Sequence, residues 1–280
     1  MNPSAQTAQE PPSRCPPLTR PHAKSMNRVV ALSLGLGLLL ASCGGTLAQL
    51  QQSYQAQRSY EGGVERYRAR DFAGSIPWLQ RALILDPSFD DAQAYLAWSY
   101  YYTGKYPEAT LHFRRALSRQ PRWEGLYDGL GWSRYRVGRY HIALETFEQA
   151  LTLDPQYRDA RVGLAFSLFE LGRYADARPH LARLTREGEG SALQRPAPDL
   201  DQVRSRYAWT LYNLGDHAQA RLQFTKGLAA RPDWYGLHNG LGWTSLKLGD
   251  AAEAKVHFQR AVQLKPDFAD AKEGLALVGQ

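Results

Sequence analysis

The amino-acid sequence predicts an all-α protein built from a row of antiparallel helical hairpins. The clearest hairpin covers residues 124–157, where apolar residues recur at helical spacing on both sides of Gly138. Gly138 permits a tight turn between the two helices, and Pro155 cannot continue the second helix. A single hairpin leaves its apolar stripe exposed to water, so neighbouring hairpins must stack on it.

Copies of this hairpin recur along the chain with a period of 34 residues. Each full copy has glycine at the turn, small and aromatic residues on the second helix, and a terminal proline. The residues that match Gly138, Ala143, Phe147, Ala150 and Pro155 are Gly104, Ala109, Phe113, Ala116 and Pro121, then Gly215, Ala220, Phe224, Gly227 and Pro232, then Gly249, Ala254, Phe258, Ala261 and Pro266. Two weaker copies retain Ser75, Leu79, Ala82 and Pro87, and Gly172, Ala177, Leu181 and Leu184.

Six hairpins are therefore expected between residues 56 and 268. Their expected ranges are 56–89, 90–123, 124–157, 158–200, 201–234 and 235–268, with a Gly- and Pro-rich insert at 188–198 in the fourth. Residues 43–55 are expected to be a linker before the first hairpin, becoming helical towards its end. Residues 269–280 are expected to form a helix that caps the last apolar face.

The repeated pattern resembles the tetratricopeptide repeat family, which combines small residues at the helix crossings with aromatic residues and a terminal proline. The resemblance covers roughly residues 56–268. It implies a right-handed solenoid of six hairpins plus a C-terminal capping helix. It also implies a broad class of function, the binding of other molecules, without naming a ligand.

The N-terminal residues have the composition of a targeting signal. Residues 1–25 are expected to be a disordered leader, and Met26 is the expected initiator of a signal peptide at 26–42. The apolar run at 29–41 is too short to cross a bilayer as a helix. Its Leu-Ala-Ser-Cys ending resembles the bacterial lipoprotein signal, which implies cleavage before Cys43 and lipidation of that cysteine. The alternative is an ordinary cleaved signal followed by a chance cysteine.

A lipid on Cys43 implies an extracytoplasmic protein anchored in the cell envelope, at the outer membrane if the host has two membranes. The formal net charge is +7, of which residues 1–42 contribute +3, and the remainder mixes both signs. The chain has no basic tract, so we expect no nucleic-acid partner. Cys15 lies in the leader, so no disulfide is expected in the mature chain.

Aromatic residues recur on the first helix of successive hairpins. In the family this helix lines the concave surface, so the resemblance places the ninth and twelfth positions of each repeat in a groove. The aromatic residues at these positions, our candidates for a ligand-binding groove, are Trp98, Trp132, Phe166, Trp209 and Trp243, and Tyr67, Tyr101, Tyr135, Phe169 and Tyr212. The rings either form a binding platform or pack between the helices.

The sequence indicates no catalytic or metal site and no cofactor. His112, His180 and His257 share the twenty-third repeat position, but they belong to alternate repeats and cannot converge on one metal ion. Asp128 and Asp159 are the one carboxylate pair considered for glycoside hydrolysis, and solvated or capping roles are expected for both.

The leading functional hypothesis is an envelope-anchored scaffold that binds a protein or peptide partner in the aromatic groove. The family's peptide-carboxylate clamp needs Lys, Arg and Asn at set positions, where this chain has Tyr60, Val64, Tyr95, Gly125 and Gly129. The alternative is a glycan-binding lipoprotein in polysaccharide export or cell-wall maintenance. A catalytic role is the third and weakest hypothesis.

Overall fold

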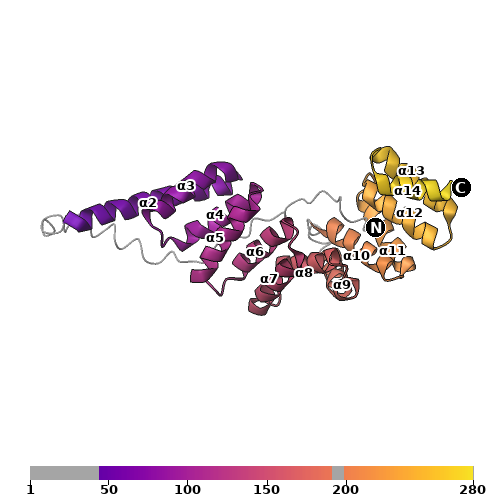
Figure 1. Ribbon diagram of the computed structural model, residues 1–280, viewed down its shortest axis with the longest axis horizontal. Coiled ribbons are helices and arrows are strands. Elements are labelled where there is room, and N and C mark those ends of the chain that lie inside the picture. The colour runs from indigo at the N-terminus through magenta and orange to yellow at the C-terminus, as the bar shows by residue number, and fades with distance from the viewer. Residues whose placement is uncertain (1–43, 191–198, 280) are drawn as a thin grey trace. The chain divides into compact units, whose positions relative to one another are not determined.

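A computed structural model describes residues 44–190 and 199–279 of the chain, and these residues form thirteen α-helices with no strand (Figure 1). The helices are α2 (Gly44–Arg68), α3 (Phe72–Leu85), α4 (Asp90–Tyr102), α5 (Tyr106–Arg119), α6 (Glu124–Arg136), α7 (Tyr140–Leu153), α8 (Arg158–Glu170), α9 (Tyr174–Gly190), α10 (Leu200–Asn213), α11 (His217–Ala230), α12 (Tyr235–Lys247), α13 (Ala251–Leu264) and α14 (Ala269–Val278). The predicted all-α repeat fold and its capping helix are confirmed.

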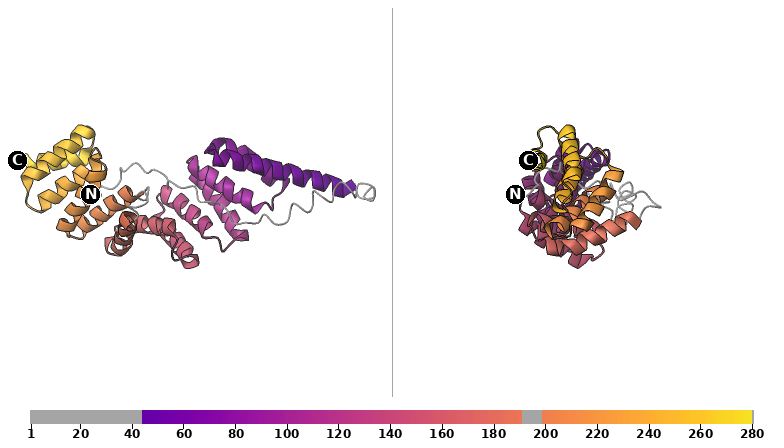
Figure 2. Two further views of the ribbon diagram at one scale, coloured as in Figure 1. Left: turned by 180° about the vertical axis from the view of Figure 1, so that it is seen from behind. Right: turned by 90° about the vertical axis from the view of Figure 1, so that its right-hand side faces the viewer.

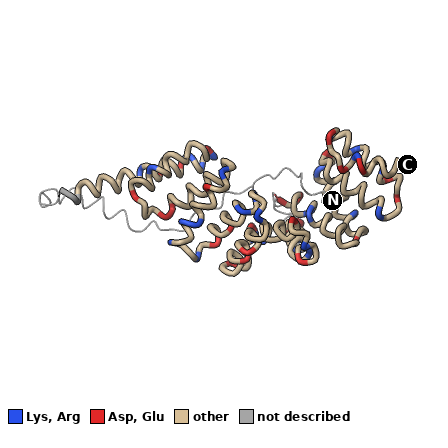
Figure 3. The backbone as a smooth tube through the Cα atoms, viewed as in Figure 1, with Lys and Arg blue, Asp and Glu red and all other residues tan. Residues whose placement is uncertain are grey.

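The helices group into two compact units, which we describe separately. The N-terminal unit holds α2–α6, and the C-terminal unit holds α7–α14. Within each unit every helix packs against the next one along the chain, and consecutive helices run in opposite directions (Figure 2). Acidic and basic residues are interspersed along the helices of both units (Figure 3).

Several sequence predictions concern residues outside the described ranges. The leader, the signal peptide, Cys43 and residues 191–198 of the insert are among them. Within the described ranges, none of the helices combines the length and the apolar character needed to cross a bilayer.

The predicted turn glycines adopt the left-handed backbone conformation. Their φ angles lie between 71° and 85°, at Gly104, Gly138, Gly172, Gly215 and Gly249. Side chains with a Cβ rarely adopt these angles, so glycine at this position permits the tight reversal between two helices. The first hairpin turns at Arg70 instead, with a φ of 61°.

In four of the repeats, the phenylalanine of the second helix packs under a glycine of the next first helix. A Cβ added to Gly129 would lie 2.2 Å from Cζ of Phe113, and one added to Gly163 would lie 2.2 Å from Cζ of Phe147. The same pairing joins Phe224 to Gly240 and Phe258 to Gly274. These contacts explain why stacked hairpins need a small residue at that position.

Two helices extend further than the sequence predicted. Residues 44–55, expected as a linker, form the first turns of the 25-residue helix α2. Residues 47–58 contain neither Gly nor Pro and are rich in Leu, Ala and Gln, which favour helix. The side-chain amide of Gln52 also donates a hydrogen bond of 2.6 Å to the carbonyl of Leu85 on α3. The start of the insert is likewise helical, because α9 continues to Gly190.

Candidate functional site

The aromatic residues predicted to line an open groove are mostly buried. Eight of the ten are buried, namely Tyr67, Trp98, Tyr101, Trp132, Tyr135, Phe166, Phe169 and Trp209. Trp98 and Tyr101 are each 1% exposed, and Tyr212 and Trp243 are half-buried. The structure therefore corrects the expectation of an aromatic platform, and these rings act as packing within each unit.

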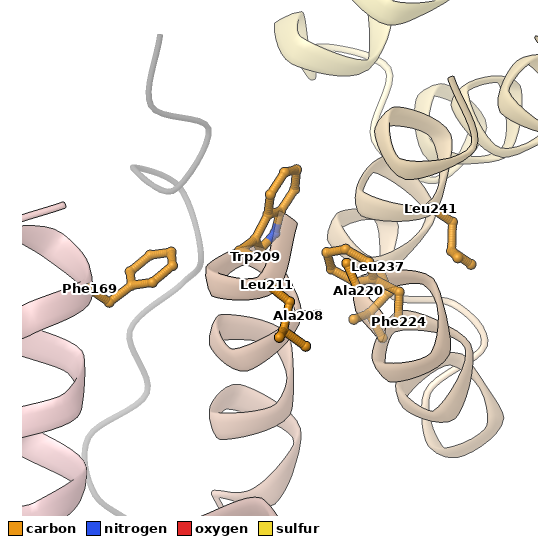
Figure 4. Packing of buried hydrophobic residues seen from close by; sticks show 8 residues of the cluster. All are labelled: Phe169, Ala208, Trp209, Leu211, Ala220, Phe224, Leu237 and Leu241. Atoms are coloured by element: carbon orange, nitrogen blue, oxygen red, sulfur yellow. The ribbon is translucent and has the colours of Figure 1, made fainter. Parts of the chain in front are cut away.

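The burial has a local cause in the packing of each hairpin on itself. The ring of Trp98 meets Phe113 edge to face at 5.1 Å between centroids, and Trp209 meets Phe224 in the same way at 5.3 Å. Figure 4 shows Trp209 among apolar side chains from α8, α10, α11 and α12. Edge-to-face pairs add to the gain from removing the rings from water, so packing outweighs exposure.

The indole N–H groups of Trp98 and Trp243, which occupy the same repeat position, have different surroundings in the two units. In the C-terminal unit, Nε1 of Trp243 and the amide of Asn239 donate to Oδ2 of Asp270 on α14, at 3.2 and 2.5 Å. In the N-terminal unit, Nε1 of Trp98 is buried and has no hydrogen-bond partner among the described residues. The repeat position that holds Asp270 is occupied there by Gly125, which has no side-chain acceptor.

In the C-terminal unit, a buried ion pair lies beside Phe166, one of the predicted groove residues. Nη2 of Arg206 lies 3.6 Å from Oε1 of Glu170, and both side chains are about nine-tenths buried. The Arg206 guanidinium also lies 3.9 Å from the ring centroid of Phe166. This arrangement covers Phe166 and leaves no ring face for a ligand.

An open groove lies instead at the start of the N-terminal unit, between α2 and α3. Its volume is about 1080 Å³. We call it the α2–α3 groove, and it is lined by Gln51, Tyr54, Gln55, Arg58, Ser59, Glu61, Gly62, Glu65, Arg66, Pro77, Trp78 and Arg81. None of the aromatic residues predicted to bind a ligand lines this groove.

Exposed apolar side chains lie in the α2–α3 groove and elsewhere on its two helices. Within it, Tyr54 is 63% exposed and Trp78 is 38% exposed, and the guanidinium of Arg66 lies 4.4 Å above the Trp78 ring. On the same two helices, Leu47 is 63% exposed and Ile84 is 78% exposed. Leu47, Leu50 and Tyr54 stand at helical spacing ahead of the first repeat, and this spacing was the sequence feature that could have indicated an apolar face on this helix.

The repeat pattern shows what kind of structure fits this groove. Between α3 and α4, Oγ of Ser75 lies 2.7 Å from Oγ of Ser99, and the amide of Gln80 donates to the hydroxyl of Tyr100 at 2.8 Å. Glu65 and Arg66 of the groove stand 34 residues before Ser99 and Tyr100. In the second repeat these positions are therefore covered by the preceding helix. In the first repeat the same face forms part of the α2–α3 groove, and no helix within residues 44–190 and 199–279 covers it.

The histidines do not assemble a larger metal cluster. Among the residues that the structure describes, no group of three or more His, Cys, Asp or Glu side chains could hold a metal ion. Nδ1 of His112 lies 2.6 Å from the amide nitrogen of Gln93, and Nδ1 of His257 lies 3.1 Å from Nδ1 of His238. Asp128 is 2% exposed and Asp159 is half-buried, so the expected solvated role does not describe Asp128.

Comparison with protein families identifies the repeat. One tetratricopeptide repeat profile matches residues 129–192 and 207–267, and a second matches residues 90–123, together more than half of the chain. No curated protein matches the sequence.

Several solved structures share the fold at low sequence identity. YrrB, described as a TPR protein with an unusual peptide-binding site, is 19% identical with a TM-score of 0.58, covering 70% of this chain and 96% of its own. The pilF protein of Pseudomonas aeruginosa is 18% identical with a TM-score of 0.64, covering 81% and 99%. PilW, described as a widely conserved type IV pilus biogenesis factor, is 22% identical with a TM-score of 0.59, covering 80% and 98%.

Proposed function

The chain belongs to the tetratricopeptide repeat family, and from this we propose that it is a scaffold of the cell envelope that holds a helical segment of a protein partner in the α2–α3 groove. The family fold supports a protein or peptide partner, and proteins of this family are typically non-catalytic scaffolds. The observation that carries the proposal is the open face of the first hairpin, with its exposed Tyr54 and Trp78.

The proposed occupant is an amphipathic helix. The equivalent face of the second repeat is covered by a helix, α3, which packs along α4. A helix that binds in a groove presents apolar anchors at i, i+3, i+4 and i+7, and such anchors would cover Tyr54 and Trp78. Each large apolar side chain removed from water contributes roughly 1.5–3 kcal/mol.

The edges of the groove suit a partner helix with charges of both signs. Arg58 and Arg81 provide positive charge, and Glu61 and Glu65 provide negative charge. Exposed charges of this kind favour a correct register more than they add affinity. The buried rings of Trp98 and Trp132 offer a glycan no face to stack on, so nothing favours the glycan hypothesis.

The envelope location rests on the lipoprotein-type signal. Helix α2 begins at Gly44, directly after Cys43, so a lipid on that cysteine would attach at the start of the helix that forms the groove. The groove would then lie close to the membrane surface, and the partner would be an envelope protein. Because PilW is described as a type IV pilus biogenesis factor, pilus-assembly proteins are the first partners to test.

Site-specific photocrosslinking in cells tests the groove. A photoreactive amino acid replaces Gln55, an exposed residue that lines the groove, and the crosslinked protein is identified by mass spectrometry. We expect one dominant partner, whose crosslink is lost in Tyr54→Glu because a buried carboxylate opposes docking. The matched control is Leu222→Glu, which changes a leucine that is 46% exposed on α11 and leaves the crosslink unchanged.

The outcome against the proposal is equally specific. A crosslink that survives Tyr54→Glu, or that Leu222→Glu removes to the same extent, would mean that the partner does not dock in the α2–α3 groove.

A further inference from the structure

The last repeat contains a histidine pair that joins two helices. Nδ1 of His238 on α12 lies 3.1 Å from Nδ1 of His257 on α13, and the ring centroids are 5.3 Å apart. Both side chains are half-buried, so one side of the pair is open to water. The two residues stand at the fourth and twenty-third positions of the same repeat.

A backbone contact fixes the proton on one of the rings. Nε2 of His238 lies 3.0 Å from the carbonyl oxygen of Pro232, which can only accept a hydrogen bond. Nε2 therefore carries the proton, and Nδ1 keeps its lone pair directed at His257. A backbone carbonyl that holds the far nitrogen of an imidazole in this way is the usual support of a metal-ligating histidine.

Burial lowers the pKa of each histidine more than any nearby charge does, and this favours the neutral form of both rings near pH 7. Arg260 lowers the pKa of His238 further, whereas Asp233 raises the pKa of His238 and Glu253 raises that of His257. A neutral imidazole is the form that binds a metal ion.

We propose that His238 and His257 chelate a divalent transition-metal ion, of which Zn²⁺ is the most suitable, with water completing its coordination. Two imidazole nitrogens bound to a tetrahedral zinc ion at about 2.0–2.1 Å stand roughly 3.3 Å apart, close to the separation of the two Nδ1 atoms. The ion would link α12 to α13 across the last hairpin. This inference does not depend on the partner proposed for the α2–α3 groove.

The chain provides its own comparison for the site. The second repeat has Gln93 and His112 at the same two positions, joined by a hydrogen bond of 2.6 Å between Nε2 and Nδ1. An amide nitrogen donates this bond but does not ligate zinc. The variant His238→Gln thus copies a pairing that the chain already uses, and it removes one metal ligand. His257→Gln similarly copies Gln223, the residue at that position in the fifth repeat.

Isothermal titration with Zn²⁺ tests the site, using the full chain without a histidine tag, in chelator-free buffer at pH 7.5. We expect one zinc site per chain, weakened at least 10-fold in both His238→Gln and His257→Gln. Loss of a group that only orients a metal ligand already costs about 10–100-fold in affinity, and each variant removes a ligand itself. Circular dichroism melts in EDTA should match the wild type for His238→Gln, which separates loss of the ligand from loss of the fold.

Two results would overturn the proposal. One is a wild-type chain that takes up no Zn²⁺ under these conditions. The other is unchanged zinc affinity in either variant, which would mean that the two histidines share only a proton.

Discussion

Replacing the indole of Trp98 and of Trp243 by a phenyl ring separates packing from hydrogen bonding in the aromatic row. Trp98→Phe removes an N–H that is buried without a partner, whereas Trp243→Phe removes an N–H that donates to Asp270. Phe166 occupies the same position in the fourth repeat, so the fold accepts a phenyl ring there.

The expected magnitudes follow from these surroundings. Loss of a hydrogen bond to a carboxylate lowers the free energy of unfolding by about 1.5–3 kcal/mol. Removal of a buried donor without a partner raises it by about 1–3 kcal/mol, because that donor no longer has to be taken out of water. The smaller ring leaves a cavity in both variants. We therefore expect Trp98→Phe to change the free energy of unfolding by less than about 1 kcal/mol, and Trp243→Phe to lower it by about 2 kcal/mol.

The assay is urea unfolding followed by far-ultraviolet circular dichroism, because tryptophan fluorescence changes with the substitution itself. Trp98→Ala provides the upper limit, with an expected loss of about 3–5 kcal/mol for a fully buried ring. If Trp98→Phe proved more destabilising than Trp243→Phe, the account of the two indole N–H groups would be refuted. A Trp98→Ala variant as stable as the wild type would refute the burial of the ring.

Three further predictions concern packing, protonation and anchoring. Gly129→Ala would place a Cβ 2.2 Å from Phe113 and should lower the free energy of unfolding by about 1–3 kcal/mol. Gly125→Ala should cost less in the same urea experiment, because the nearest atom to its Cβ would be a side-chain nitrogen of Trp123 at 3.2 Å. Burial lowers the pKa of His112 to about 4, below its usual 6.5, so between these pH values the unfolded chain binds a proton that the folded chain does not. The free energy of unfolding should therefore fall as the pH decreases from 6.5 to 4 and stay level above 6.5. Urea midpoints at several pH values should show this loss, and His112→Gln should lessen it. Cys43→Ser should move the protein from the membrane fraction to the soluble extracytoplasmic fraction, and an unchanged distribution would contradict lipid anchoring.

The repeat architecture could be predicted from the sequence because its causes are local. Gly138 and its four equivalents are needed wherever two helices reverse, and each adopts the left-handed conformation that its place in the pattern implies. The apolar spacing of each second helix fixes which face is buried, and so predicts that hairpins stack. The start of α2 was less well predicted, because the sequence indicated helix only towards the end of residues 44–55.

The burial of the aromatic rings could not be predicted from the sequence in the same way. Position nine of a repeat specifies which side of the helix Trp98 occupies, but its exposure depends on Phe113 from the next helix. The pairing of His238 with His257 likewise depends on how two helices of one hairpin face each other. Among the residues that the structure describes, no helix covers Glu65 and Arg66 in the way that α3 covers their equivalents on α4, and the α2–α3 groove lies at this face.

The all-α class, the 34-residue unit and the positions of its turns can be read from the amino-acid order alone, because they follow from backbone conformation and from the period of apolar residues along one segment. Which of those apolar residues remain in contact with water depends on how the helices pack. That property belongs to pairs of helices in contact, since a side chain is buried only when its neighbour supplies the surface that covers it.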